Sequence, residues 1–244
     1  MSPRDLKGQV AVVSGATSDI GRAVCFGLAA AGAQPCLLGR DSGALEELAK
    51  SLRSVTDKVF VYPIDLTVDA SIADLGARLG RDLGRVDVLV HSAGVFHMAP
   101  HVAADVGDLD RQYRANVRGP YLLTQSLLPP LKAGHGQIVF LNSTVGLEAR
   151  ASVGQYASTQ HALRAIADAL RAEVNADGVR VLTVYLGRTA TSRQARIFKL
   201  EGRAYAPELL MQPEDVAEMV LATLQLPRTA EVTEIRMRPL VKSY

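Results

Sequence analysis

Short runs rich in Val, Ile and Leu alternate with amphipathic segments along almost all of this chain. The runs span residues 9–15, 34–39, 58–64, 85–94, 137–143, 179–186 and 231–239. They are typical of strands buried on both faces, whereas segments between them, such as residues 19–32, 42–54 and 71–84, have helical spacing. Because parallel strands are joined by helical crossovers, the alternation predicts a doubly wound, seven-stranded parallel α/β sheet with helices on both faces.

The same pattern predicts a single domain over residues 1–244, because no linker, repeat or low-complexity block divides the chain. A hydrophobic content of 48% is enough for a sizeable core. The one long segment expected to be irregular, residues 186–212, precedes an expected helix at 213–224. Since such loops in compact domains are usually functional, we expect a lid over the substrate.

Composition excludes several kinds of partner. Lys and Arg number 27 against 25 Asp and Glu, without a dense basic run, which argues against nucleic acid binding. No apolar run of membrane-spanning length occurs, and the N-terminus lacks signal-peptide features. Cys25 and Cys36 lack CxxC spacing. We therefore expect a cytoplasmic protein without a metal site.

The stretch VSGATSDIGRAV leaves the first expected strand and enters the first expected helix. Gly15 permits unusual backbone angles and Gly21 permits close packing, while the helix start offers N–H groups to a pyrophosphate. Asp19 would disfavour a nearby phosphate if it pointed inward, so we interpret it as a helix cap. The turn predicts nucleotide binding.

Three further motifs follow in order: ANVRGPYLLTQ with Asn116, IVFLNSTVG with Ser143, and GQYASTQ with Tyr156. Together with the glycine turn and the pair Asp65-Leu66, they resemble the short-chain dehydrogenase/reductase family over nearly the whole chain. The resemblance implies an NAD(P)-binding, Rossmann-type domain. The chain departs from the family pattern at Asp19 in the glycine turn, at His91 and Ser92 in place of two asparagines, at Gln160 in place of a lysine, and at Leu186 in place of a proline.

The resemblance also implies the roles of the site residues. Ser143 binds the substrate oxygen, Tyr156 exchanges the proton on that oxygen, and Asn116 holds a water. Gln160 lies one turn after Tyr156, so its amide can reach a ribose hydroxyl, but it brings no charge. Tyr156 is therefore expected to stay protonated at neutral pH, which suits carbonyl reduction better than alcohol oxidation.

The residue at the end of the second expected strand indicates whether NAD or NADP is preferred. Arginine there pairs with the 2′-phosphate of NADP, whereas an acidic residue binds the ribose of NAD. The residue is Arg40, which predicts NADP(H). The alternative is that Arg40 is a solvated charge paired to Asp41 or Glu46, and that Asp41 reaches the ribose.

The remaining cofactor contacts are implied by the resemblance. His91 is interpreted as a partly buried imidazole satisfied by backbone groups, with a proton relay as the alternative. The cofactor-binding set is Gly15, Thr17, Ser18, Asp19, Ile20, Gly21, Arg40, Asp65, Leu66, Ala93, Gly94, Tyr156, Gln160, Gly187, Thr189 and Thr191.

The predicted function is an NADP(H)-dependent oxidoreductase acting on a ketone, aldehyde or secondary alcohol. The alternatives are a non-redox dehydratase, isomerase or cyclase on the same fold, and a catalytically inactive nucleotide-binding subunit. By family analogy the pocket is mostly apolar, although Arg150, Arg188, Arg193 and Arg196 could meet an acidic group. In the family that the chain resembles, the helices corresponding to those expected at 109–131 and 155–174 build the interface between subunits, so the resemblance implies a homodimer or homotetramer.

Overall fold

Seven strands form one parallel sheet in the order β3-β2-β1-β4-β5-β6-β7. The computed structural model describes residues 5–241, so both ends of the predicted 1–244 domain lie outside the described residues. The predicted fold class is confirmed. The strands are β1 Val10–Ser14, β2 Gln34–Gly39, β3 Phe60–Pro63, β4 Val88–His91, β5 Gln137–Ser143, β6 Arg180–Leu186 and β7 Glu234–Met237.

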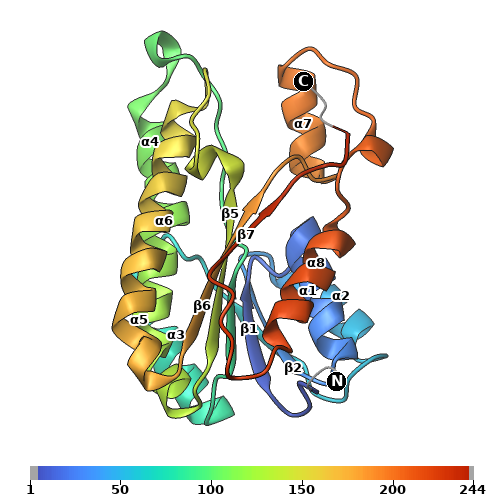
Figure 1. Cartoon of the computed structure of the whole chain (residues 1–244), viewed down its shortest axis with the longest axis vertical. Coiled ribbons are helices and arrows are strands. Elements are labelled where there is room, and N and C mark those ends of the chain that lie inside the picture. Colours follow the sequence, from blue (N-terminus) through green and yellow to red (C-terminus); the bar gives the residue numbers. More distant parts are fainter. Residues whose placement is uncertain (1–4, 242–244) are drawn as a thin grey trace.

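Helices cover both faces of the sheet. In Figure 1, α1, α2 and α8 lie on one side, and α3, α5 and α6 lie on the other. Among residues 5–241, no helix combines the length and the apolar character needed to cross a membrane. The helices are α1 Asp19–Ala30, α2 Ser42–Leu52, α3 Asp69–Leu83, α4 Val106–Tyr113, α5 Gly119–Ala133, α6 Gly154–Val174, α7 Ser192–Leu200 and α8 Pro213–Leu224.

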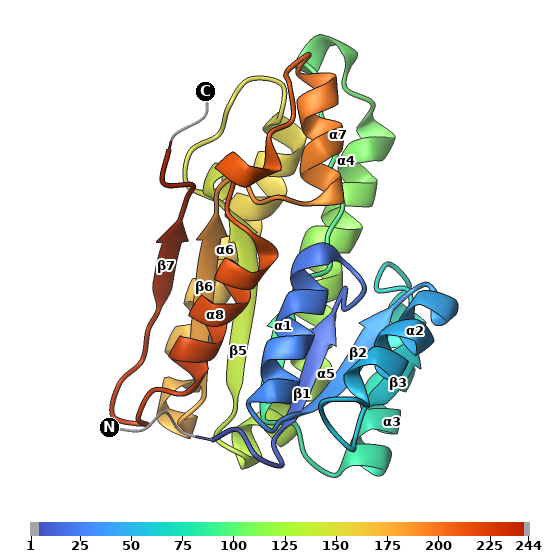
Figure 2. The same cartoon turned by 90° about the vertical axis from the view of Figure 1, so that its right-hand side faces the viewer.

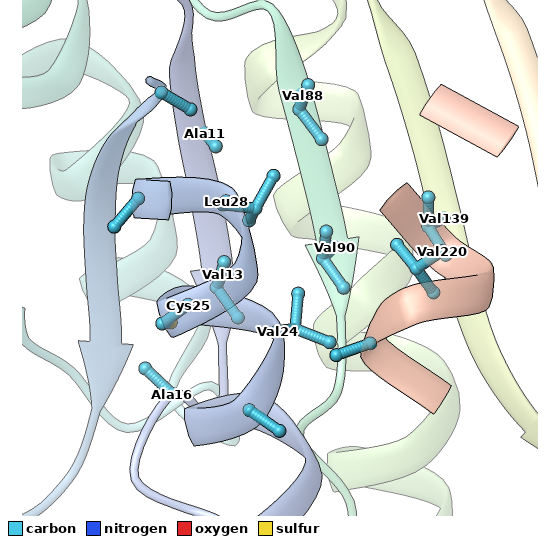
Figure 3. Close-up of a cluster of buried hydrophobic side chains, with 14 of the residues drawn as sticks. Ala11, Val13, Ala16, Val24, Cys25, Leu28, Val88, Val90, Val139 and Val220 are labelled. Carbon is cyan, nitrogen blue, oxygen red and sulfur yellow. The ribbon is translucent and has the colours of Figure 1, made fainter. Parts of the chain in front are cut away.

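Alternate residues of each central strand feed two separate cores. Val13 packs with α1, α2 and α8, whereas Val12 packs with α3, α5 and α6. Figure 3 shows the first core, where Val24 and Leu28 of α1 pack near Val88 and Val90 of β4. A strand buried on both faces needs apolar residues at every position, which explains the uninterrupted runs in the sequence.

The strand order reverses between β1 and β4. From β1 the chain builds outward through β2 and β3, and from β4 it builds outward the other way. Figure 2 shows the strands pointing toward the end of the molecule where α4 and α7 lie. In open parallel sheets, ligands bind beyond the carboxyl ends of the strands at such a reversal.

Two of the expected elements differ in the structure. The helix expected over 109–131 is divided into α4, a π-helical segment Arg114–Arg118, and α5. The segment 186–212 was expected to be irregular, but it contains α7 and the short 3₁₀ turn Pro207–Leu209. The helix α7 was not predicted because its sequence is highly charged. In the structure Phe198 is buried and the side chain of Thr191 caps the first turn.

Truncating a side chain in the core beneath α1 should destabilise the fold. Leu28 has 0% of its surface exposed, so Leu28→Ala should lower the free energy of unfolding by about 2–5 kcal/mol. Val102 is 96% exposed, and Val102→Ala should cost less than about 0.5 kcal/mol. Urea unfolding followed by circular dichroism measures both. Equal stability losses would contradict the packing described here.

Candidate active site

The turn between β1 and α1 brings two backbones together with no side chain between them. Gly15 has a φ of +64°, and a Cβ there would lie 2.7 Å from the Cα of Ala93. A Cβ at Gly21 would lie 2.2 Å from the carbonyl oxygen of Gly15. Both positions therefore require glycine.

Ser18, rather than Asp19, caps α1. The Oγ of Ser18 accepts from the backbone N–H of Gly21 at 3.1 Å and donates to the carbonyl of Gly15 at 2.8 Å. Asp19 accepts from both the backbone N–H and the hydroxyl of Ser192, at 3.0 and 2.9 Å. The predicted capping role of Asp19 was wrong because Ser18 satisfies the helix end one position earlier. Asp19 instead joins α1 to the start of α7.

Two polar side chains fix the chain where it leaves β4. The Oγ of Ser14 accepts from the N–H groups of Ser92 and Ala93, at 3.2 and 3.3 Å. Asn116, in the π-helical segment, accepts from the N–H of Val95 at 2.8 Å and donates to its carbonyl at 2.9 Å. These contacts hold residues 92–95 beside the glycine turn.

His91 ends β4 and is 2% exposed. Its Nε2 shares a hydrogen bond of 2.8 Å with the hydroxyl of Thr124 on α5, and its ring stacks on Phe140 with 4.7 Å between centroids. The expectation that backbone groups satisfy this imidazole was wrong, because α5 brings a side-chain hydroxyl to it. Burial lowers the pKa of His91 to about 3, so the ring is neutral at neutral pH.

Gln160 lies behind the pocket and is 4% exposed. The hydroxyl of Thr159 accepts from the Nδ2 of Asn116 at 3.1 Å and from the Nε2 of Gln160 at 3.4 Å. The carbonyl of Gln160 accepts from the Nδ2 of Asn142 at 3.0 Å. Thr159 thus connects Asn116 to Gln160, a link that sequence analysis missed although Thr159 lies between Tyr156 and Gln160.

Tyr156 and Ser143 line the same pocket, at the end of β5. The ring of Phe96 packs edge-on against Tyr156, with centroids 4.9 Å apart. Asn142 accepts from the N–H of Ser143 at 2.6 Å. Burial raises the pKa of Tyr156 above its ordinary value, although the nearby charge of Arg193 and the hydrogen bonds of Ser143 and Arg193 oppose the rise. The phenol is therefore protonated at neutral pH.

Arg193 reaches from α7 into the site. Its Nη2 donates to the carbonyl of Gly94 at 2.5 Å, and the guanidinium lies near enough to Tyr156 for its positive charge to lower the pKa of the phenol. Sequence analysis placed Arg193 among four arginines near the substrate but did not find its proximity to Tyr156. The proximity of Arg193 to Tyr156 could not be predicted because the helix that carries Arg193 was itself not predicted.

These groups surround one pocket with a volume of about 440 Å³. It brings together nine of the predicted site residues, while Asn116 and Gln160 lie behind it. Arg188, which also lines it, is paired with Glu201 at 2.8 Å. The nine are Thr17, Ser18, Asp19, Ile20, Ser143, Tyr156, Gly187, Thr189 and Thr191.

The residues predicted to bind the adenosine end follow β2 and β3. Arg40 is exposed and has no ion-pair partner within residues 5–241. Asp41 caps α2 by accepting from the N–H of Ala44 at 3.0 Å. Asp65 accepts from the N–H and the hydroxyl of Thr67, at 2.9 and 2.8 Å, and Leu66 is buried. The alternative in which Arg40 pairs with Asp41 or Glu46 is not what the structure contains.

The sequence pattern described as "short chain dehydrogenase" matches residues 9–202. The chain is 31% identical over 237 residues to an uncharacterized oxidoreductase of Staphylococcus aureus USA300, covering 96% of this chain and 98% of the relative. It is 33% identical over 240 residues to glycine betaine reductase ATRR of Emericella nidulans, covering 96% of this chain but only 19% of that longer protein. The chain belongs to the short-chain dehydrogenase family.

Solved structures agree with this assignment. An alcohol dehydrogenase from Thermococcus sibiricus, complexed with 5-hydroxy-NADP, is 26% identical with a TM-score of 0.88, covering 98% of this chain and 99% of that one. A protein from Escherichia coli CFT073, described as a short chain dehydrogenase and complexed with NADPH, is 28% identical with a TM-score of 0.88, covering 95% and 98%. Relatives of this fold therefore bind the predicted kind of cofactor.

Removing the carboxylate of Asp19 should loosen α7. Asp19→Ala loses both hydrogen bonds to Ser192, so backbone amides of α7 should exchange about tenfold faster, corresponding to about 1.4 kcal/mol. Ser192→Ala removes only the hydroxyl contact and should have a smaller effect. Asp41→Ala, which removes the cap of α2, is the matched control. Hydrogen exchange read by mass spectrometry tests this, and unchanged exchange in Asp19→Ala would contradict the contact.

Proposed function

We propose that this protein is an NADP(H)-dependent oxidoreductase that reduces a ketone or aldehyde, or oxidises a secondary alcohol in the reverse direction. The observation that carries the proposal is that Ser143 and Tyr156 line one pocket at the carboxyl ends of the strands, together with the start of α1. Membership of the short-chain dehydrogenase family and the NADP complexes of similar structures support it.

The residues around the glycine turn fit a dinucleotide. Any side chain at position 15 or 21 would collide with neighbouring backbone atoms, so the turn stays compact. The start of α1 offers N–H groups to a pyrophosphate. When bound, NADPH would supply a hydride from its nicotinamide. We assign the adenosine end to Arg40, Asp65 and Leu66, the middle to residues 15–21 with Ala93 and Gly94, and the nicotinamide end to Gly187, Thr189, Thr191, Tyr156 and Gln160.

Proton transfer is assigned to Tyr156. In the reduction, the substrate oxygen accepts a hydrogen bond from Ser143 and takes the proton of the Tyr156 hydroxyl, while the carbonyl carbon receives the hydride. The raised pKa of Tyr156 keeps this proton in place at neutral pH, which favours reduction over oxidation. Asn116 is assigned to hold a water, and the amide of Gln160 to bind the ribose.

The segment 186–212 is proposed as the substrate lid. It carries α7, lines the pocket through Arg193 and Ile197, and is fastened to the glycine turn by Asp19. Much of the opposite wall is apolar, with Phe96, Met98 and Val153. Because Arg188 and Arg193 are already engaged with Glu201 and Gly94, we favour a largely apolar carbonyl substrate over an acidic one.

A homodimer or homotetramer in the cytoplasm remains part of the proposal. Tyr113 of α4 and Tyr121 of α5 are 51% and 50% exposed, which supports an interface between subunits along these helices. Cys25 and Cys36 are both free and buried, which is compatible with a reducing compartment.

A non-redox enzyme is the second candidate. A partly buried, protonated Tyr156 near Ser143 is also suited to acid catalysis of dehydration or isomerisation, which needs no net oxidation. Product formed from a carbonyl or hydroxy compound without consumption of NADPH would favour it over the oxidoreductase. Binding of NADPH without turnover of any substrate would favour an inactive nucleotide-binding subunit.

Loss of the Tyr156 hydroxyl should abolish most carbonyl reduction. Tyr156→Phe should lower the rate of NADPH consumption with a ketone panel about a hundredfold or more, because the proton donor is removed. Binding of NADPH, read by energy transfer from tyrosine emission, should persist. Tyr121→Phe, on the exposed face of α5, is the control and should retain full activity. Full activity in Tyr156→Phe would refute the assigned role.

Loss of the Arg40 guanidinium should weaken binding of NADPH selectively. Arg40→Ala should reduce the affinity for NADPH about tenfold to a hundredfold, because a charge-assisted contact with the 2′-phosphate is lost. Affinity for NADH should change little. Arg53→Ala removes an exposed charge at the other end of α2 and serves as the control. Equal loss of affinity for both cofactors in Arg40→Ala would remove the basis for the NADP preference.

A further inference from the structure

The guanidinium of Arg193 bridges two structural elements at the centre of the site. It donates to the carbonyl of Gly94, after β4, at 2.5 Å, and it lines the same pocket as Tyr156 of α6, near enough for its charge to lower the pKa of that phenol. The arginine itself comes from α7, whose start is held by Asp19 through Ser192. The contact with Gly94 and the attachment of α7 to Asp19 thus hold one positive charge beside the hydroxyl of Tyr156.

The other charged groups near the pocket are engaged elsewhere or lie at the surface. Arg188 is paired with Glu201 at 2.8 Å, and Asp19 accepts from Ser192 at 3.0 Å. His97, near Phe96, lies 3.2 Å from Asp108. Arg150 and Arg196 are exposed, and so is His161 on α6. The positive charge of Arg193, by contrast, lowers the pKa of the Tyr156 hydroxyl.

The helix that carries Tyr156 provides no charge of its own at this point. Gln160, one turn later, is neutral and donates to Thr159, and its side chain is buried. A tyrosine in a buried site loses its proton only at a large cost unless a cation or hydrogen-bond donors stabilise the phenolate. Arginine suits this task because its guanidinium stays protonated even when it is partly buried.

We propose that Arg193 is the cation of this active site and supplies from α7 the positive charge that Gln160 does not supply from α6. In the reduction, the proton leaves the Tyr156 hydroxyl for the substrate oxygen, and Arg193 donates a hydrogen bond to the phenolate that remains. In the oxidation, the same phenolate takes the proton back from the alcohol. The assignment rests on the proposed function, in which Tyr156 exchanges this proton.

This arrangement ties the acidity of Tyr156 to the position of α7. The guanidinium of Arg193 reaches Tyr156 only when α7 lies over the pocket, because the Arg193 side chain must span from α7 to both Gly94 and Tyr156. A segment that covers the substrate would then also prepare the proton donor. Closure of α7 over the substrate and placement of the Arg193 charge beside Tyr156 would then occur together.

The ionisation of Tyr156 tests the assignment without requiring turnover. The protein would be prepared with 3,5-difluorotyrosine, whose phenol ionises near neutral pH, and titrated by ¹⁹F NMR with NADP⁺ bound. The signal of residue 156 is identified by its loss in Tyr156→Phe. Arg193→Gln should raise the pKa of this phenol by about one unit or more, which is about a tenfold change in the ionisation constant. Arg193→Lys should restore part of the shift.

Three further variants complete the test. Lys199→Gln removes an exposed charge from the same helix at a position that does not line the pocket, and should leave the titration unchanged. Gln160→Lys placed in the Arg193→Gln background should lower the pKa again, because it returns a cation to α6. Arg193→Met serves as a second neutral variant if Arg193→Gln does not fold.

Equal pKa values in the wild type and in the neutral Arg193 variants, with NADP⁺ bound, would overturn the assignment. A shift seen only without cofactor would overturn it as well, since Arg193 would then merely fill the empty site. A clear arginine-dependent shift in a protein that consumes no NADPH would support the charge assignment while refuting the proposed function.

Discussion

The site depends on hydrogen bonds that Ser14 and Asn116 accept from the backbone just after β4. These bonds hold the carboxyl end of β4 against the carboxyl end of β1. They allow the backbone of Ala93 to lie where only a glycine at position 15 leaves room. The close approach occurs where the strand order reverses, so the neighbouring loops diverge and leave a pocket. The two hydrophobic cores keep β1 and β4 in register and so support this polar junction.

Much of this arrangement is readable from the sequence, because burial on both faces leaves a continuous apolar run for each strand. The glycine turn, Ser143 and Tyr156 could be found because they stand in motifs that resemble those of the short-chain dehydrogenase/reductase family. What escaped prediction depends on tertiary contacts. Nothing in the local sequence indicates that Ser18 and not Asp19 caps α1, that Thr124 satisfies His91, or that Arg193 reaches Tyr156. The helix α7 was missed because its residues are mostly polar and its one buried apolar residue, Phe198, gives no periodic signal.

The chemistry of the site follows from where charge is placed around a buried phenol. Burial favours the protonated form of Tyr156, and the neutral Gln160 on the same helix does not oppose this. Arg193 opposes it from another element, one that also covers the pocket. In the reaction that we propose, Tyr156 donates its proton to the substrate and the charge of Arg193 stabilises the phenolate that remains. We therefore propose that the site favours reduction of a carbonyl and that this reaction depends on the position of α7.

Transfer of deuterium tests the central claim most directly. The protein would be incubated with NADPH carrying deuterium at C4 of the nicotinamide, on each face in turn, and with a panel of apolar ketones and aldehydes. The account predicts that one of the two labels appears on the carbon that bears the new hydroxyl, as read by mass spectrometry, and that Tyr156→Phe forms little of this product. Product without deuterium from either cofactor, or bound NADPH that is never consumed with any carbonyl, would contradict it.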